Sequence, residues 1–452
     1  MGRPEGGDAK VKSPISGPDV VHDIVGIGFG PSNLALSIAV EEHNAGLAAD
    51  RRIDALFLER QPRFGWHRGM LIDDATMQVS FLKDLVTLRN PTSDYSFLCF
   101  LRERGRLIDF LNQKTLFPLR MEFHEYFEWA AARVAHLVAY DSEVVAVDPV
   151  RGEDGRVAYF DVVRRDPERP GATVTHRARN ISVAMGLEPH VPPGLELAER
   201  IWHNSELIPR AGQLADTGAP VRRAIVLGAG QSAAETVDYL HRTFPDAEVC
   251  SVFAKYGYTP ADDSPFANRI FDPEAVDVYF SSPSEVKQSL LDYHRSTNYS
   301  VVDMELIESL YATTYREKVA GRERLRFLNV SRVRGVTPAD GGGGLEVAVE
   351  FLPTGERQVL PADVLVLATG YRPRDLTALL GDAAKLCLKD DGDAIRVGRD
   401  HRVETAPEVT AGIYLQGGTE HTHGLSSTLL STVAVRAEEI HRSVLGDRLT
   451  AV

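Results

Sequence analysis

A glycine-rich turn near the start of the chain constrains the fold more than any other feature. Residues 26–34 read Gly-Ile-Gly-Phe-Gly-Pro-Ser-Asn-Leu; an apolar, strand-like stretch precedes them and a helix-like apolar face follows them. In dinucleotide-binding folds such a turn lets the backbone approach a pyrophosphate, whose charge the helix N-terminus attracts. We therefore expect dinucleotide contacts at Gly26, Gly28, Gly30 and Pro31, with Pro31 in place of the usual third glycine.

An acidic residue follows the second predicted strand of the same unit. The strand-like stretch 53–58 ends at Glu59, where an acid can bind a ribose hydroxyl. Glu59 lies somewhat further along than the ~20 residues usual for this fold, so the helix expected over 32–44 must be followed by a loop. A chance glycine-rich turn is the weaker interpretation, because strand, helix and acid come in the right order. The pattern predicts a first dinucleotide site.

A second turn of the same kind lies in the middle of the chain. Residues 224–235 read Ala-Ile-Val-Leu-Gly-Ala-Gly-Gln-Ser-Ala-Ala-Glu, a strand and a Gly-x-Gly-x-x-Ala turn that opens a helix. The next strand, 247–253, is followed by Lys255 and by no acid, and a cation there accommodates a 2′-phosphate. This favours NADP(H) over NAD(H). The alternative is a solvated lysine, and three other candidate cations are Arg222, Arg223 and Arg242.

Two nucleotide sites without a metal or disulfide motif indicate an oxidoreductase that combines a flavin with a nicotinamide. The first site would take FAD and the second NADPH. We expect the α/β fold class, with two Rossmann-like dinucleotide-binding domains and a smaller, partly helical substrate-binding region. The expected division is a disordered tail at 1–19, an FAD domain at 20–205 and 365–452, and an NADPH domain at 206–364 that includes the helical segment 284–320.

Three further stretches should surround these sites. An amphipathic helix is expected over 122–135. The apolar stretch 363–371 closes on a glycine and is expected to return the chain to the FAD domain. A helix is expected to open at 423–428, with its N-terminus facing the flavin.

Composition excludes several other functions. The formal net charge of −14 argues against nucleic acid or an anionic membrane surface as partner. No apolar run approaches the ~20 residues of a membrane span, and the N-terminus lacks the apolar region of a signal peptide. The three cysteines, Cys99, Cys250 and Cys387, lie far apart and form no Cys-x-x-Cys motif. We therefore expect no metal site, no redox-active disulfide and a cytoplasmic location.

Several long motifs now identify a family. They read GIGFGPSNLA, FLERQPRFGWH, MQVSFLKDLVTLRNPTSDYSFL, GAGQSAAE, ADDSPFANRIFDP, TNYSVVD, LATGY and THGLSSTLLS. Together they resemble the microbial N-hydroxylating flavin monooxygenases, the ornithine and lysine N-monooxygenases of siderophore biosynthesis. The resemblance spans about residues 20–440.

The resemblance implies a set of cofactor contacts. For the flavin these are Glu59, Gln61, Trp66, His67 and Gln78, with Val144 at the adenine end and Thr428, Leu429 and Leu430 at the isoalloxazine end. For the nicotinamide nucleotide they are Gly228, Ala229, Gly230, Gln231 and Ser232, with Asn298, Tyr299 and Ser300 along its ribose and amide. The family commonly has an arginine where Ala254 stands here, so Lys255 would have to substitute.

The resemblance also implies the substrate and the reaction. Lys83, Asn268, Phe271, Asn298 and Ser431 would surround an amino acid, with Lys83 binding its carboxylate. NADPH would reduce FAD, and O2 would add at the flavin C4a. The resulting hydroperoxyflavin would oxidise the uncharged side-chain amine of L-ornithine to N5-hydroxyornithine. No residue is assigned as a catalytic acid or base.

Other functions stay open at this point. L-Lysine N6-hydroxylation is the first alternative, because one methylene changes affinity by only ~1–3 kcal/mol. Hydroxylation of a diamine, putrescine or cadaverine, would leave Lys83 with no carboxylate to bind. More distant alternatives are another class B flavin monooxygenase, a flavin-dependent disulfide reductase and a non-enzymatic flavoprotein. The resemblance further suggests a homotetramer.

Overall fold

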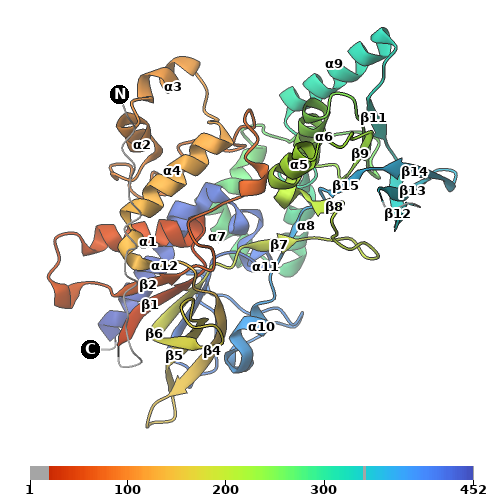
Figure 1. The fold of residues 1–452 in the computed structure, drawn as a ribbon. Helices are drawn as coiled ribbons and strands as arrows, with labels where there is room; N and C mark the ends of the chain where they lie inside the picture. Colours follow the sequence, from red (N-terminus) through yellow and green to blue (C-terminus); the bar gives the residue numbers. More distant parts are fainter. Residues whose placement is uncertain (1–19, 340–342, 451–452) are drawn as a thin grey trace.

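The computed structural model describes residues 20–339 and 343–450, and for 447–450 only the backbone. The tail expected at 1–19 lies outside the described residues. Two sheets with a parallel core, each flanked by helices, make up most of the molecule, and the chain runs between them along β7 (Figure 1). Within the described part, no helix is long and apolar enough to cross a membrane.

The first sheet is built from both ends of the chain. Its strand order is β3-β2-β1-β6-β5-β4, and β17 also pairs with β6. β1, β2, β3 and β17 run parallel to their neighbours, whereas β4, β5 and β6 pair antiparallel. The bounds are β1 Val21–Ile27, β2 Ala55–Leu58, β3 Val138–Ala139, β4 Val144–Arg151, β5 Val157–Arg165, β6 Thr173–Val183 and β17 Gly412–Leu415.

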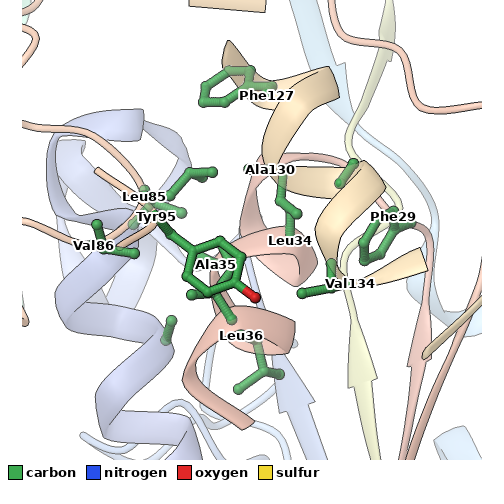
Figure 2. Close-up of a cluster of buried hydrophobic side chains, with 14 of the residues drawn as sticks. Phe29, Leu34, Ala35, Leu36, Leu85, Val86, Tyr95, Phe127, Ala130 and Val134 are labelled. Carbon is green, nitrogen blue, oxygen red and sulfur yellow. The ribbon is translucent and has the colours of Figure 1, made fainter. Parts of the chain in front are cut away.

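One face of this sheet is covered by a large aromatic core. Helices α1 (Pro31–Asn44) and α12 (Val433–Thr450) pack against each other, and α4 (Arg120–Arg133) lies beside them. The helix expected over 122–135 is α4, which begins and ends two residues earlier. Figure 2 shows Leu34 and Leu36 of α1 among Phe127 and Ala130 of α4. This packing fixes the start of α1, which is where the first glycine turn lies.

The second sheet is entirely parallel and has the order β11-β10-β9-β15-β8. Its strands are β8 Ile201–His203, β9 Arg223–Leu227, β10 Glu248–Val252, β11 Leu325–Leu328 and β15 Val364–Leu367. The helices of this part are α5 Leu207–Asp216, α6 Gln231–Thr243 and α9 Met304–Ala320. An antiparallel sheet of β12 Ser331–Pro338, β13 Leu345–Phe351 and β14 Glu356–Ala362 packs on it.

The strand at 363–371 does not return the chain to the first sheet, so that expectation is wrong. β15 lies between β9 and β8 in the second sheet. β8 also belongs there, although it falls before residue 206. An apolar strand is buried in either sheet, so its composition does not say which sheet it joins. The chain crosses between the sheets at β7 (Leu187–Pro189) and β16 (Tyr371–Pro373), which pair antiparallel.

Short helices complete the fold. They are α2 Phe97–Glu103, α3 Leu107–Gln113, α7 Pro273–Ser281, α8 Ser284–His294, α10 Leu376–Leu380 and α11 Glu420–His423. The helical segment expected over 284–320 consists of α8 and α9 with an irregular stretch between them. The helix expected to open at 423–428 begins later: 3-10 turns cover Leu425–Thr428 and Leu430–Thr432, and α12 starts at Val433.

A buried polar cluster joins the last part of the chain to α12. The rings of His401 and His423 stack with centroids 4.2 Å apart. Glu439 accepts from His401 Nε2 at 3.0 Å and pairs with Arg399 at 2.8 Å. Burial alone would raise the pKa of Glu439, but these partners lower it to about 2. Burial, and then the neighbouring His401, lower the pKa of His423 to about 3.

His423 should make the fold sensitive to mild acid. Between pH 6.5 and 3 the unfolded chain binds a proton at this imidazole and the folded chain does not, so stability falls as the pH drops through this range. From pH 7 to 5.5 the loss is about 1 kcal/mol. We expect His423→Gln to lose correspondingly less in urea-induced unfolding, with His136→Gln at an exposed position as control. Identical pH dependence in His423→Gln and the unchanged protein would contradict this assignment.

Candidate active site

The first glycine turn joins β1 to α1 and leaves the start of the helix open. Gly28 has φ +83°, and a Cβ there would collide with the carbonyl of Ala184, so only glycine fits. Gly30 is the N-cap of α1, and no described side chain caps the helix. Pro31 at the first position lacks an N–H. The remaining N–H groups of the first turn can therefore bind an anionic group.

Glu59 lies beside this turn, at the end of β2. It is buried, with 6% of its surface exposed. Its carboxylate accepts from the N–H of Phe29 at 2.7 Å and from the N–H of Gln61 at 2.9 Å. A carboxylate has about four acceptor positions, so Glu59 can hold the turn and still bind ribose hydroxyls. That ribose role stays a prediction.

A buried polar network behind the turn was not predicted from the sequence. The amide of Asn33 donates to the carbonyls of Gly28 at 2.7 Å and Ser182 at 3.3 Å. Its oxygen accepts from Ser182 Oγ at 2.8 Å and from Gln416 Nε2 at 2.6 Å. The signal in the sequence is a polar residue inside the apolar face of the predicted helix. The network ties the turn to β6 and β17.

An aromatic group lines the boundary between the two sheets. The ring of His67, in left-handed conformation at φ 47°, lies 4.7 Å from that of Trp66 and 5.8 Å from that of Tyr371 in β16. Part of His67 is exposed, and its ring contacts these two aromatic side chains. Desolvation by the surrounding protein, and then the charge of Arg120, lower its pKa to about 4. The imidazole of His67 is therefore uncharged at neutral pH. Gln78 is exposed, and Val144 is half-buried at the start of β4.

The second glycine turn repeats the design between β9 and α6. A Cβ on Gly228 would collide with the carbonyl of Ala368, and Gly230 is an N-cap without a described side-chain cap. A Cβ on Gly230 would lie 3.5 Å from Cα of Ser300. Lys255 Nζ donates to the carbonyl of Ser300 at 2.6 Å. The structure thus places Gly230, Ser300 and Lys255 side by side, while Ala229, Gln231 and Ser232 are half-buried at the helix start.

Some of the predicted substrate residues lie beside the 3-10 turns before α12. The turn Ala267–Phe271, which carries Asn268 and Phe271, packs against the turn Leu425–Thr428. Tyr299 donates its hydroxyl to Glu420 of α11 at 2.6 Å, and burial followed by this partner raises its pKa. Ser431 is buried, and its Oγ has no hydrogen-bond partner among the described residues. Asn298, next to Tyr299, is half-buried. Leu429 and Leu430, which precede Ser431, are half-buried as well.

Lys83 lies on a loop that a buried acid holds in place. Its side chain is half-buried and makes no ion pair or hydrogen bond with the described residues. Asp84, 3% exposed, accepts from the N–H groups of Thr87 at 2.7 Å and Phe97 at 2.8 Å. Burial raises the pKa of Asp84, although these hydrogen bonds act in the opposite direction. This role of Asp84 was not predicted from the sequence, where its signal is an acid directly after Lys83 and before apolar residues.

One buried ion pair connects the two sheets across the site. Arg120 at the start of α4 donates to both oxygens of Glu235 in α6, at 2.6 and 2.8 Å. The side chains are 12% and 6% exposed. Glu235 also accepts from Gln231 at 3.0 Å, and Gln231 accepts from the N–H of Asp303, the N-cap of α9. The ion pair thus reaches the predicted nicotinamide turn. Nothing in the local sequence indicated this contact.

Comparisons with known proteins identify the family of this chain. The model of a family described as L-lysine 6-monooxygenase/L-ornithine 5-monooxygenase matches residues 20–373. The L-ornithine N(5)-monooxygenase of Burkholderia cepacia is 40% identical over 441 residues, which cover 95% of this chain and 96% of that protein.

Solved structures give the same result. The ornithine N-hydroxylase of Kutzneria sp. 744, described with reduced FAD, NADP+ and L-ornithine, has a TM-score of 0.88 and 46% identity, covering 95% of this chain and 100% of that one. The L-lysine 6-monooxygenase from Pseudomonas syringae has a TM-score of 0.82 and 30% identity, covering 94% and 99%. The chain therefore belongs to the L-lysine 6-monooxygenase/L-ornithine 5-monooxygenase family.

Proposed function

We propose that this protein is an FAD- and NADPH-dependent L-ornithine N5-monooxygenase. The observation that carries the substrate assignment is Lys83, a half-buried cation with no anionic partner among the described residues, on a loop fixed by buried Asp84. A desolvated ammonium favours a carboxylate partner, and an amino acid supplies one. Relatives support the choice of amino acid, since an ornithine hydroxylase is 46% identical and a lysine monooxygenase 30% identical.

The residues present fit both cofactors. The open N-terminus of α1, the crowded Gly28 and the acid Glu59 suit the pyrophosphate and ribose of FAD. The open N-terminus of α6, with Lys255 beside it, suits NADPH. When bound, the reduced flavin supplies the activation of O2. The protein supplies position: it holds the two nucleotides on separate sheets and joins the sheets through Arg120 and Glu235.

The side-chain amine of the substrate must be uncharged to be oxidised, since the reaction uses its lone pair. A free alkylammonium has a pKa of ~10.4, so a site with carboxylates near the amine would oppose the reaction. The predicted neighbours Asn268 and Ser431 are uncharged and can hydrogen-bond to a neutral amine. Lys83 at the other end would orient the substrate and add positive charge, which also favours the neutral amine.

The cytoplasmic location and the homotetramer belong to this proposal as well. α8 and α9 expose large apolar side chains, among them Tyr293 at 80%, Tyr311 at 76% and Val319 at 71%. Exposed apolar surface of this kind supports a subunit contact.

A hydroxylamine assay with FAD and NADPH tests the function. The amines are L-ornithine, L-lysine, putrescine and cadaverine, each with a parallel assay for hydrogen peroxide. We expect hydroxylated product from L-ornithine. Product from L-lysine alone would show an L-lysine N6-monooxygenase instead. Product from a diamine alone would contradict the carboxylate role of Lys83. NADPH consumption that yields only peroxide with all four amines would reject ornithine as substrate.

Lys83→Ala should raise the KM for L-ornithine roughly ten- to a hundredfold, because a charge-assisted hydrogen bond is lost. The rate at which NADPH reduces the flavin should stay nearly unchanged, which stopped-flow absorbance measures. Lys318→Ala, on the exposed face of α9, is the matched control. An unchanged ornithine KM in Lys83→Ala would refute the carboxylate role.

Lys255→Ala should weaken the binding of NADPH more than the binding of NADH. The ammonium is positioned by the Ser300 carbonyl beside the second turn, where the 2′-phosphate of NADPH would lie. We expect the KM for NADPH to rise roughly tenfold or more, since charged hydrogen bonds contribute ≈ 1.5–3 kcal/mol. The KM for NADH should change little. An equal rise for both nucleotides would mean that another group holds the 2′-phosphate.

A further inference from the structure

Arg436 of α12 is a buried cation that forms no ion pair with the described residues, although the charge of Glu439 acts on it from nearby. It is 3% exposed. Nη1 donates to the carbonyl of Ser427 at 2.7 Å, Nη2 donates to the hydroxyl of Ser32 at 3.2 Å, and Nε has no partner among the described residues. Glu439, three residues further along the helix, offsets part of this charge, but its carboxylate is already paired with Arg399 and His401. Burial lowers the pKa of Arg436 to about 10, so the guanidinium stays charged at neutral pH.

The position of Arg436 makes the burial of its charge more costly. Ser32 is the second residue of α1, so Arg436 reaches the N-terminal end of that helix. This end already carries the positive end of the helix dipole, which repels cations and attracts anions. A cavity of about 20 Å³ borders Arg436 and Ser427, room for about one water. One water can hydrogen-bond to the guanidinium but cannot neutralise it.

Both positive features converge where a pyrophosphate would lie. The first glycine turn ends at Gly30, and the open N–H groups of α1 follow it. The hydroxyl of Ser32 accepts from Arg436 and keeps its own proton, which it can donate to a phosphate oxygen. We propose that Arg436 is a positioning residue for FAD. Its buried positive charge would act on the pyrophosphate, and Ser32 would link the two by hydrogen bonds.

This inference rests on the proposed function for the identity of the cofactor. It also gives the buried arginine a function: its charge is only partly offset by Glu439 in the cofactor-free protein, and a bound anion would offset it further. A purely structural role, as a hydrogen-bond donor to the Ser427 carbonyl, makes a different prediction. It would stabilise the cofactor-free and the FAD-bound protein equally.

The test compares Arg436→Gln, Arg436→Lys and Ser32→Ala with the unchanged protein. Cofactor-free protein is titrated with FAD by flavin fluorescence, and thermal midpoints are recorded with and without FAD. Arg164→Gln is the matched control, because Arg164 is also buried in the first domain, at 8% exposure, but bonds to His176 in the antiparallel part of the sheet.

We expect Arg436→Gln to raise the FAD dissociation constant roughly ten- to a hundredfold, as loss of one buried charge near a phosphate implies. FAD should raise its thermal midpoint less than that of the unchanged protein, while the midpoint without FAD should not fall. Arg436→Lys should bind FAD more tightly than Arg436→Gln, and Ser32→Ala should lie between Arg436→Gln and the unchanged protein.

Two results would overturn the inference. One is an FAD dissociation constant in Arg436→Gln and Ser32→Ala equal to that of the unchanged protein. The other is an equal drop of both midpoints in Arg436→Gln, which would show the structural role alone. Ser32→Ala removes only a hydroxyl, so it decides the question if Arg436→Gln does not fold. FAD binding without ornithine hydroxylation would reject the proposed substrate and leave this inference standing.

Discussion

The arrangement of the first domain depends on the hydrogen bonds of Asn33. This amide joins the turn at Gly28, the end of β6 at Ser182 and the residue after β17 at Gln416. The second domain is inserted between β6 and β17, so β17 must find its place beside β6 after a long excursion of the chain. Apolar packing alone is not directional. A buried amide with fixed donors and acceptors is directional. It sets the position of β17 at the edge of the sheet where the first glycine turn lies.

The placement of the second domain depends on a different kind of contact. Arg120 and Glu235 form a bidentate pair that also involves the carbonyls of Met70 and Thr76. A buried ion pair adds little net stability, because desolvation offsets most of the attraction. The pair nevertheless allows only a small range of relative orientations, since both carboxylate oxygens must face the guanidinium. The pair therefore fixes the orientation of α6, and with it the second glycine turn, relative to α4. Met70, Ile72 and Ala75 also pack into the apolar core of the second sheet, so the ion pair and this apolar contact together align the two parts.

The places of several candidate site residues in the fold could be predicted because their signals are local, while their binding roles stay predictions. The two glycine turns, Glu59 and Lys255 each follow a strand within a few residues, and the structure places them as the spacing indicated. The membership of β15 in the second sheet could not be predicted, since four apolar residues fit either core. Neither could the start of α12 at Val433, because the 3-10 turns before it carry the same residue types as a helix. Arg120 and Glu235 are 115 residues apart in the chain, and no periodicity connects them.

The distribution of charge, and not its total, explains how an acidic chain can accept two polyanionic cofactors. The net charge of −14 acts mostly through exposed groups, which salt screens over about 10 Å. Close to the two turns lie local positive charges: the N-termini of α1 and α6, with Arg436 behind the first and Lys255 beside the second. The buried carboxylate of Glu59 beside the first turn is offset in part by the N–H groups of Phe29 and Gln61. Water is largely excluded from Arg436, so its field there is screened far less than that of a surface carboxylate. A phosphate bound at either glycine turn would meet this field, because no Cβ would stand between backbone and ligand.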